Sequence, residues 1–121
     1  MANGWGPTAG NAALTTLLST YGWIKLHIGD PGANGTANPA VETTRKQVSV
    51  AAAAGGSIAS NADLTWTAVA ASEDYTHFTA WTASSAGTFG FSGTVTAVAV
   101  TAGATFTITS GNFVVSLVLA S

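Results

Sequence analysis

Residues 94–109 read Thr-Val-Thr-Ala-Val-Ala-Val-Thr-Ala-Gly-Ala-Thr-Phe-Thr-Ile-Thr, and this stretch decides the fold class. Apolar residues alternate with small polar ones, so one face of each extended segment is apolar and the other is largely Thr or Ala. Ala102-Gly103 interrupts the alternation and is typical of a turn. Thr and Val also favour the pleated, half-buried surface of a sheet. The stretch therefore predicts two β-strands separated by a turn.

The same pattern continues on both sides of this stretch. Alternation first appears over 23–28, where Ile24 and Leu26 share one face of a predicted strand. Further strands are predicted near 45–50 and at 63–68, 75–82, 88–91, 94–100, 104–109 and 113–119. Gly-containing turns such as Ser92-Gly93 separate them. This spacing predicts a mainly β fold, an antiparallel sandwich or barrel of jelly-roll type, in one domain over residues 11–121.

The N-terminal segment differs from the rest of the chain. Residues 1–10 are rich in Gly and Pro and are predicted to form an extended arm that carries Trp5 and Pro7. Trp5 packs either on the chain's own core or on a neighbouring subunit, and the sequence leaves both open. Asn11 can cap a short helix over 11–21, which Gly22 ends.

Ionised side chains are scarce and unevenly placed. They make up 7% of the chain, the net charge is −2, and no Asp, Glu, Lys or Arg follows Asp74. A typical soluble domain has about a quarter of its residues charged. We therefore expect much of the surface to meet other subunits, most simply in a homo-oligomer such as a trimer. The alternative is a monomeric sandwich whose edges are covered by its own N-terminal arm.

Composition also argues against several partners. The three cations Lys25, Arg45 and Lys46 are too few to neutralise a row of phosphates, so nucleic acid is not an expected partner. No apolar run approaches the ~20 residues of a membrane helix, and the N-terminus lacks the pattern of a signal peptide. The absence of Cys excludes disulfides and thiolate metal sites.

Few residues could carry chemistry. His27 and His77 fit no metal-ligand spacing, and each lies in a predicted strand where an imidazole can hydrogen-bond across the sheet. The adjacent carboxylates Glu73 and Asp74 offer too few oxygens for a hard cation. No nucleophile, phosphate-binding or dinucleotide motif occurs. We therefore expect no catalytic residue, no metal and no cofactor.

Aromatic residues offer another kind of site. Trp23 and Trp81 are candidates for exposed anchors, and with Tyr75 they could line a sugar-binding platform. The alternative is that they are buried under the helix or under the predicted surface loop 29–40.

Two segments carry a family resemblance. The first is Leu26-His27-Ile28-Gly29-Asp30-Pro31-Gly32, followed by the basic residue Arg45 at the start of the next strand. The second is Tyr75-Thr76-His77-Phe78-Thr79-Ala80-Trp81, followed by Gly87-Thr88-Phe89. Over most of its length the chain resembles a family of small tailed-phage virion structural proteins, which are labelled tail-fibre or minor tail proteins and are similar to head-decoration proteins. It departs from the usual pattern at Ile28 and Thr82.

The resemblance implies a structural, non-enzymatic protein of the phage virion. A single domain without shaft-like repeats, a flexible arm and no obvious receptor tip favour a capsid decoration protein. Such a protein would be made in the bacterial host cytoplasm, bind the outer surface of the major capsid protein lattice and stabilise it. The expected contact residues are Trp5 and Pro7 in the arm and the loop Asp30-Pro31-Gly32.

Three alternatives remain open at this point. The first is a tail protein, either a fibre module, a minor tail protein or an adaptor. The second is a carbohydrate-binding adhesin that uses Trp23, Trp81 or Tyr75. The third is a hydrolase, which would need His27 or His77.

Overall fold

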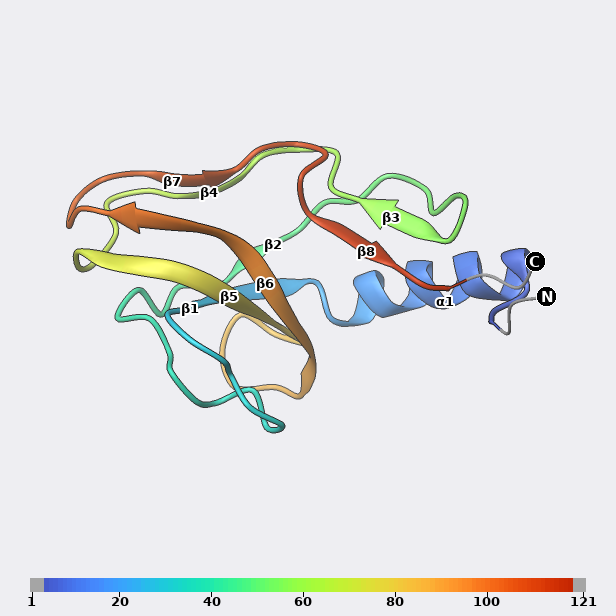
Figure 1. Cartoon of the computed structure of the whole chain (residues 1–121), viewed down its shortest axis with the longest axis horizontal. Helices are drawn as coiled ribbons and strands as arrows, with labels where there is room; N and C mark the ends of the chain where they lie inside the picture. Colours follow the sequence, from blue (N-terminus) through green and yellow to red (C-terminus); the bar gives the residue numbers. More distant parts are fainter. Residues whose placement is uncertain (1–3, 119–121) are drawn as a thin grey trace.

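The computed structural model describes residues 4–118 and contains one helix followed by eight strands (Figure 1). In chain order these are α1 (Pro7–Thr20), β1 (Trp23–His27), β2 (Lys46–Gln47), β3 (Ser57–Ala59), β4 (Leu64–Trp66), β5 (Glu73–Trp81), β6 (Phe89–Val100), β7 (Phe106–Ile108) and β8 (Val114–Ser116). The prediction of a mainly β fold with one N-terminal helix is confirmed.

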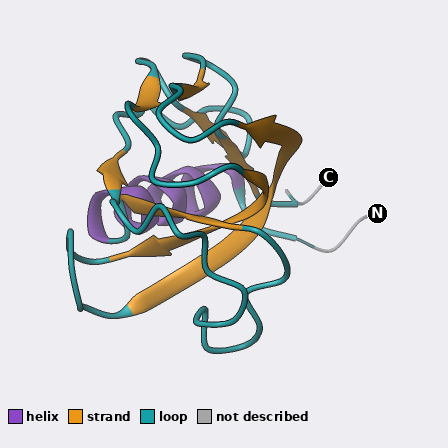
Figure 2. Ribbon diagram, turned by 90° about the vertical axis from the view of Figure 1, so that its left-hand side faces the viewer, coloured by secondary structure: helices purple, strands orange, loops and turns teal. Residues whose placement is uncertain are grey.

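The strands form three antiparallel sheets. The largest has the order β2-β1-β5-β6, and two small sheets pair β3 with β8 and β4 with β7. The β4–β7 pair lies over the large sheet (Figure 1). The β3–β8 pair lies toward the end of the molecule that carries α1, where β3 contacts the helix (Figure 1). Figure 2 shows the same layers from the end opposite α1. The arrangement is sandwich-like, and the described strands do not close into a barrel.

The core lies between the large sheet and the strands that cover it. Ile24 and Leu26 of β1 are fully buried, as their alternation predicts. The ring of Phe106 in β7 bridges the two layers, with its centroid 5.1 Å from that of Tyr75 and 5.7 Å from that of Trp66. These aromatic contacts hold the small sheet against the large one.

The helix begins at Pro7, four residues before the predicted start. Proline is well placed in the first turn of a helix because its missing N–H would have no partner there. The backbone N–H of Trp5 donates to the carbonyl of Val118 at 2.8 Å, so the chain before the helix is also tied down. The predicted extended arm is therefore wrong from residue 7 onward, and residues 1–3 lie outside the described part.

Strand β6 is one continuous strand where the sequence predicts two separated by a turn at Ser92-Gly93. Gly93 serves close packing, because a Cβ there would lie 2.7 Å from a ring carbon of Phe78. The pairing with β5 is irregular between Tyr75 and His77, which face Val98 and Thr94 respectively. This bulge bends β6 in the middle of its length. The C-terminal strand is shorter than predicted, and residue 119 lies outside the described residues.

Candidate functional site

A hydrogen-bonded chain of side chains occupies the motif region that carries the family resemblance. His27 is fully buried at the end of β1, where its Nδ1 lies 2.9 Å from the carbonyl oxygen of Ala37. Its Nε2 lies 2.9 Å from Oγ1 of Thr79 on the paired strand β5. The indole N–H of Trp81 donates to the same oxygen at 2.7 Å. The prediction that this imidazole hydrogen-bonds across the sheet is confirmed.

These partners fix the protonation state of His27. A carbonyl oxygen only accepts, so Nδ1 of His27 carries the proton. An indole N–H only donates, so the Thr79 hydroxyl accepts from Trp81, and in the neutral ring it gives its own proton to Nε2. Burial lowers the pKa of His27, with hydrogen bonds to the Ala37 and Asn38 backbone acting in the opposite direction. With both ring nitrogens engaged, the neutral imidazole has a positioning role.

Arg45 closes the same end of the sheet. Its guanidinium carbon lies 4.4 Å from the centroid of the Trp81 ring, and Nη1 donates to the carbonyls of Ala83 and Ala86 at 2.9 and 2.7 Å. The Trp81 ring also contacts Phe89, and the two ring centroids are 5.5 Å apart. Arg45 therefore fastens the turn between β5 and β6 onto an aromatic pair of the buried Trp81 and the half-buried Phe89.

The loop that follows β1 is held by its own residues. The carboxylate of Asp30 accepts from the N–H of Gly32 at 2.8 Å, and the Asn38 side chain donates to the carbonyl of Asp30 at 2.9 Å. Pro31 is fully buried, and Gly35 packs directly on the ring of Phe89. The family motif thus builds a fixed loop, with Asp30 and Gly32 exposed at its surface.

The structure separates the residues predicted to make contacts. Trp5 is 47% exposed and Pro7 is exposed at the start of α1, far from the loop that follows β1 (Figure 1). Trp81 is buried and Trp23 is half-buried, which disfavours a platform formed by these two rings. The predicted contact residues therefore belong to two distant regions.

Glu73 and His77 on β5 also form local hydrogen bonds. Glu73 accepts from the N–H groups of Val41 and Glu42 at 3.0 and 3.2 Å, and Nδ1 of His77 lies 2.8 Å from the hydroxyl of Thr76. Across residues 4–118 no three His, Cys, Asp or Glu side chains gather closely enough to hold a metal ion.

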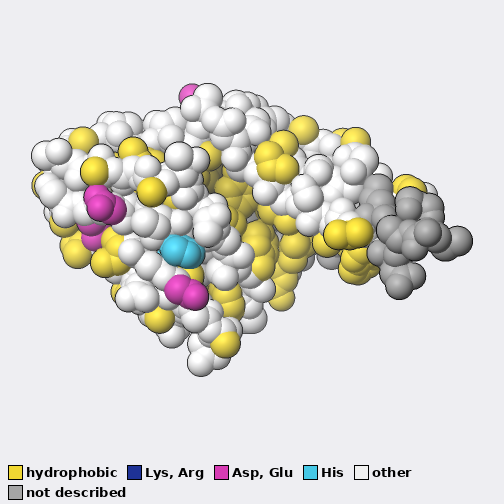
Figure 3. Space-filling view, in the orientation of Figure 1, with side chains coloured by type: hydrophobic (Ala, Val, Ile, Leu, Met, Phe, Trp, Pro, Cys, Tyr) yellow, Lys and Arg dark blue, Asp and Glu magenta, His cyan; other side chains and the backbone are white. Residues whose placement is uncertain are grey.

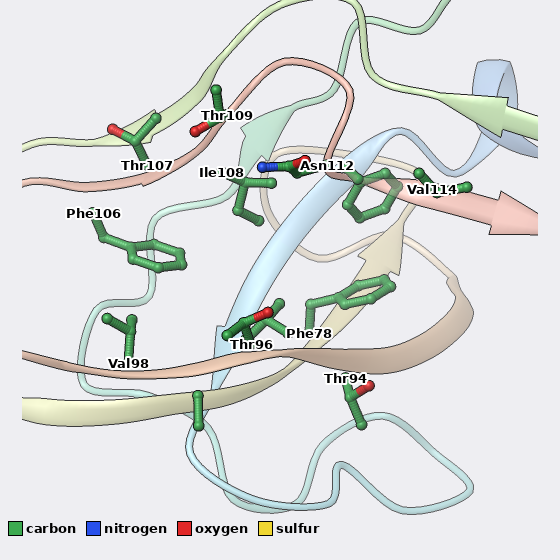
Figure 4. A pocket seen from close by; sticks show the side chains of 13 residues that line it. Phe78, Thr94, Thr96, Val98, Phe106, Thr107, Ile108, Thr109, Asn112 and Val114 are labelled. Atoms are coloured by element: carbon green, nitrogen blue, oxygen red, sulfur yellow. The ribbon is translucent and has the colours of Figure 1, made fainter.

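A groove missed by the sequence analysis opens between β6 and β7. Its volume is about 510 Å³, and the two strands that border it pair with β5 and β4 and not with each other. Figure 4 shows the rings of Phe78 and Phe106 and the side chain of Ile108 pointing into it, with Thr96 and Val98 on the β6 side. No ionised side chain lines the groove.

An exposed apolar row continues from the groove along β8. Val114 lines the groove and is 52% exposed, and Val118 farther along the same segment is 69% exposed. Val115 and Leu117, which alternate with them, are half-buried against the core. We call this combined surface the neutral face. It comprises residues 94–98, 106–109 and 112–114 together with Ser116, Val118 and the adjoining Trp5.

Figure 3 shows the side of the molecule on which the groove lies. A hollow floored by hydrophobic side chains separates the main body from the end that carries α1. The acidic side chains in this view lie on the main body, one of them with a His beside the rim of the hollow, and no Lys or Arg is seen on this side. Sequence reasoning had one signal for this surface, the absence of charge after Asp74, but no means of locating it.

Comparison with known families identifies the class of protein. This β-rich chain with a neutral face is a phage structural protein, because a family model described as "Podophage GP4 fiber I protein gp80" matches residues 7–116. The chain belongs to that family. No curated protein matches it. Within the described residues no helix has the length and apolar character needed to cross a membrane.

Proposed function

We propose that this protein is a non-enzymatic structural subunit of a phage fibre, carried on the virion. The observation that carries the proposal is the match to a fibre-protein family over residues 7–116, nearly the whole chain. The protein would act by occupying and bridging positions in an assembly. Its partners would be further copies of itself and other virion proteins.

The geometry of the motif region supports a structural role. His27 uses both ring nitrogens to hold Ala37 and Thr79, and is buried away from any substrate. Arg45 is similarly committed to two backbone carbonyls and to the Trp81 ring. These side chains make the loop end of the sheet rigid. A hydrolase based on His27 would have to break this network first.

A fibre is favoured over capsid decoration for two reasons. The family description names a fibre protein. The flexible arm that favoured decoration is lost from residue 7 onward, because Pro7 begins α1 and the Trp5 N–H is bonded to Val118. Decoration of the capsid surface remains the second candidate, since the chain is a small β-domain without a shaft-like repeat.

Copy number on purified virions separates the two candidates. A fibre subunit should be far less abundant than the major capsid protein, whereas a decoration protein approaches it in number. Quantitative gel densitometry of purified particles, combined with labelling of the protein in electron micrographs, measures both abundance and position. Abundance near that of the capsid protein, with label spread over the shell, would overturn the fibre assignment.

A further inference from the structure

We propose that the neutral face is the surface through which copies of this chain bind one another. The inference deepens the proposed structural function by naming the surface and the partner. It is argued from the strand edges, the exposed side chains and the charge distribution of the described residues.

In the described part of the chain, the outer edge of β6 is protected neither by a charged side chain nor by a paired strand. β6 runs from Phe89 to Val100 at one side of the large sheet, and no strand within residues 4–118 pairs with its outer edge. Natural proteins protect such edges with Lys, Pro, bulges or covering segments. β6 contains neither Lys nor Pro, and its bulge at 94–98 opens onto the groove. The uncharged part of this edge beyond the half-buried residues 89–91 is mostly exposed and is expected to be covered in the working assembly.

Exposed apolar side chains lie both at the groove and beyond it. Six large hydrophobic residues are well exposed in the described chain, and two of these, Val98 and Val114, line the groove. Trp5 and Val118, which share a backbone hydrogen bond, continue the exposed row past β8. The other two, Ile28 and Val41, lie on the segments that flank the loop after β1. Clustering of this kind marks an interaction surface, whereas single exposed apolar residues are normal.

The charge distribution selects a second copy as the occupant. Every strand that contributes to the neutral face follows Asp74, so the face carries no ionised side chain. A partner with Lys or Glu at the contact would bury those charges without counter-charges, which is costly. Another copy of this chain offers the same Thr, Ala and Val surface. Its hydroxyl groups can exchange hydrogen bonds while its apolar groups leave water.

The molecule is also large enough for such a contact. A stable interface covers about 800 Å² on each partner, which is about one eighth of the 6210 Å² accessible surface of this chain. The groove lies between β6 and β7, and the row along β8 continues from it toward the end that carries α1 (Figure 1).

The test compares two substitutions of the same kind at different places. Val114→Lys puts a charge on the neutral face, and Val41→Lys puts one at a valine of similar exposure outside it. Sedimentation velocity and light scattering over a range of concentrations measure association of the purified full chain. We expect the wild-type chain and Val41→Lys to associate alike, and Val114→Lys to raise the dissociation constant at least about tenfold.

Two outcomes would overturn the proposal. One is a wild-type chain that stays monomeric at the highest concentration reached, even if Val114→Lys is lost from particles, because the face would then bind a different virion protein. The other is a Val114→Lys chain that associates as the wild type does. If Val114→Lys unfolds by circular dichroism, Val98→Lys on the β6 side replaces it and must show the same loss of association.

Self-association and particle location are measured separately. The association of purified chains does not depend on whether the protein sits on a fibre or a shell. A copy number near that of the capsid protein would therefore overturn the fibre assignment without affecting the proposed interface. A failed association test would overturn the proposed interface without affecting the fibre assignment.

Discussion

Replacing Thr79 by Val removes one hydroxyl that two buried ring nitrogens share. In the native chain this oxygen lies 2.9 Å from Nε2 of His27 and accepts the indole N–H of Trp81 at 2.7 Å. Thr79 is fully buried. Valine keeps nearly the same shape, so the substitution opens no cavity and isolates the hydrogen bonds.

The expected cost follows from the groups left behind. A buried donor or acceptor that loses its partner costs about 1–3 kcal/mol. His27 is fully buried and bears the whole of this penalty, while Trp81 is 9% exposed and its N–H can recover part of it in water. We therefore expect the free energy of unfolding to fall by about 3 kcal/mol, which lowers Tm by about 10 °C in a domain of this size.

Urea and thermal unfolding, followed by circular dichroism and Trp fluorescence, measure the loss. Thr65→Val is the matched control, because its hydroxyl meets Thr107 at 3.3 Å on an exposed face. That control should change the free energy by no more than about 0.5 kcal/mol. Thr79→Ser, which keeps the hydroxyl, should recover most of the stability. A Thr79→Val chain as stable as Thr65→Val would refute the network.

Three further predictions rest on single residues. Because burial lowers the pKa of His27, stability should be complete above pH ~6.5 and fall as the pH drops below that value, and His27→Gln should flatten this dependence in acid unfolding curves. Burial, reinforced by Glu73 and Glu42, raises the pKa of Tyr75 to about 12, so stability should be lost between pH ~10 and about 12. The Tyr75 hydroxyl has no hydrogen-bond partner among residues 4–118, so Tyr75→Phe should remove this alkaline loss without lowering Tm at neutral pH. Gly93→Ala should cost about 1–3 kcal/mol in urea unfolding because of the Phe78 ring, whereas Gly6→Ala, with open space at its Cβ, should cost less, about 0.5–1 kcal/mol from the loss of a glycine N-cap of α1.

Sequence patterns correctly predicted the features that depend on residues close together in the chain, such as strand faces and glycine turns. The alternation of Ile24 and Leu26 correctly assigned the buried face of β1, since residues two apart in a strand share a face. A Gly-Gly pair is typical of a turn, and Gly55-Gly56 forms one before β3, with both glycines at positive φ angles. Gly103 likewise adopts a positive φ in the turn between β6 and β7.

The errors of the sequence-based prediction arise where one residue type suits two local structures or where contacts with distant residues decide the structure. Gly93 looks like a turn residue in sequence, but its role depends on Phe78 of the adjacent strand. Pro7 looks like part of an arm, yet a proline also fits the first turn of a helix. The groove depends on β6 and β7 pairing with different partners, and alternation within a strand does not specify its neighbours. The sequence therefore predicted an uncharged surface, but it did not predict which strands would form it.

Several of the few charged side chains form hydrogen bonds with backbone groups of loops and do not lie on the neutral face. Arg45 binds the carbonyls of the turn after β5, and Glu73 binds two backbone N–H groups near Val41. Asp30 accepts from Gly32 within its own loop, and Asp63 accepts from the N–H of Ser110. These charges hold the ends of strands and are not placed along the edge of β6. No ionised residue lies on β6 itself, so no charge of its own protects this long neutral edge. The neutral face that we propose as its cover is present on every copy of the chain.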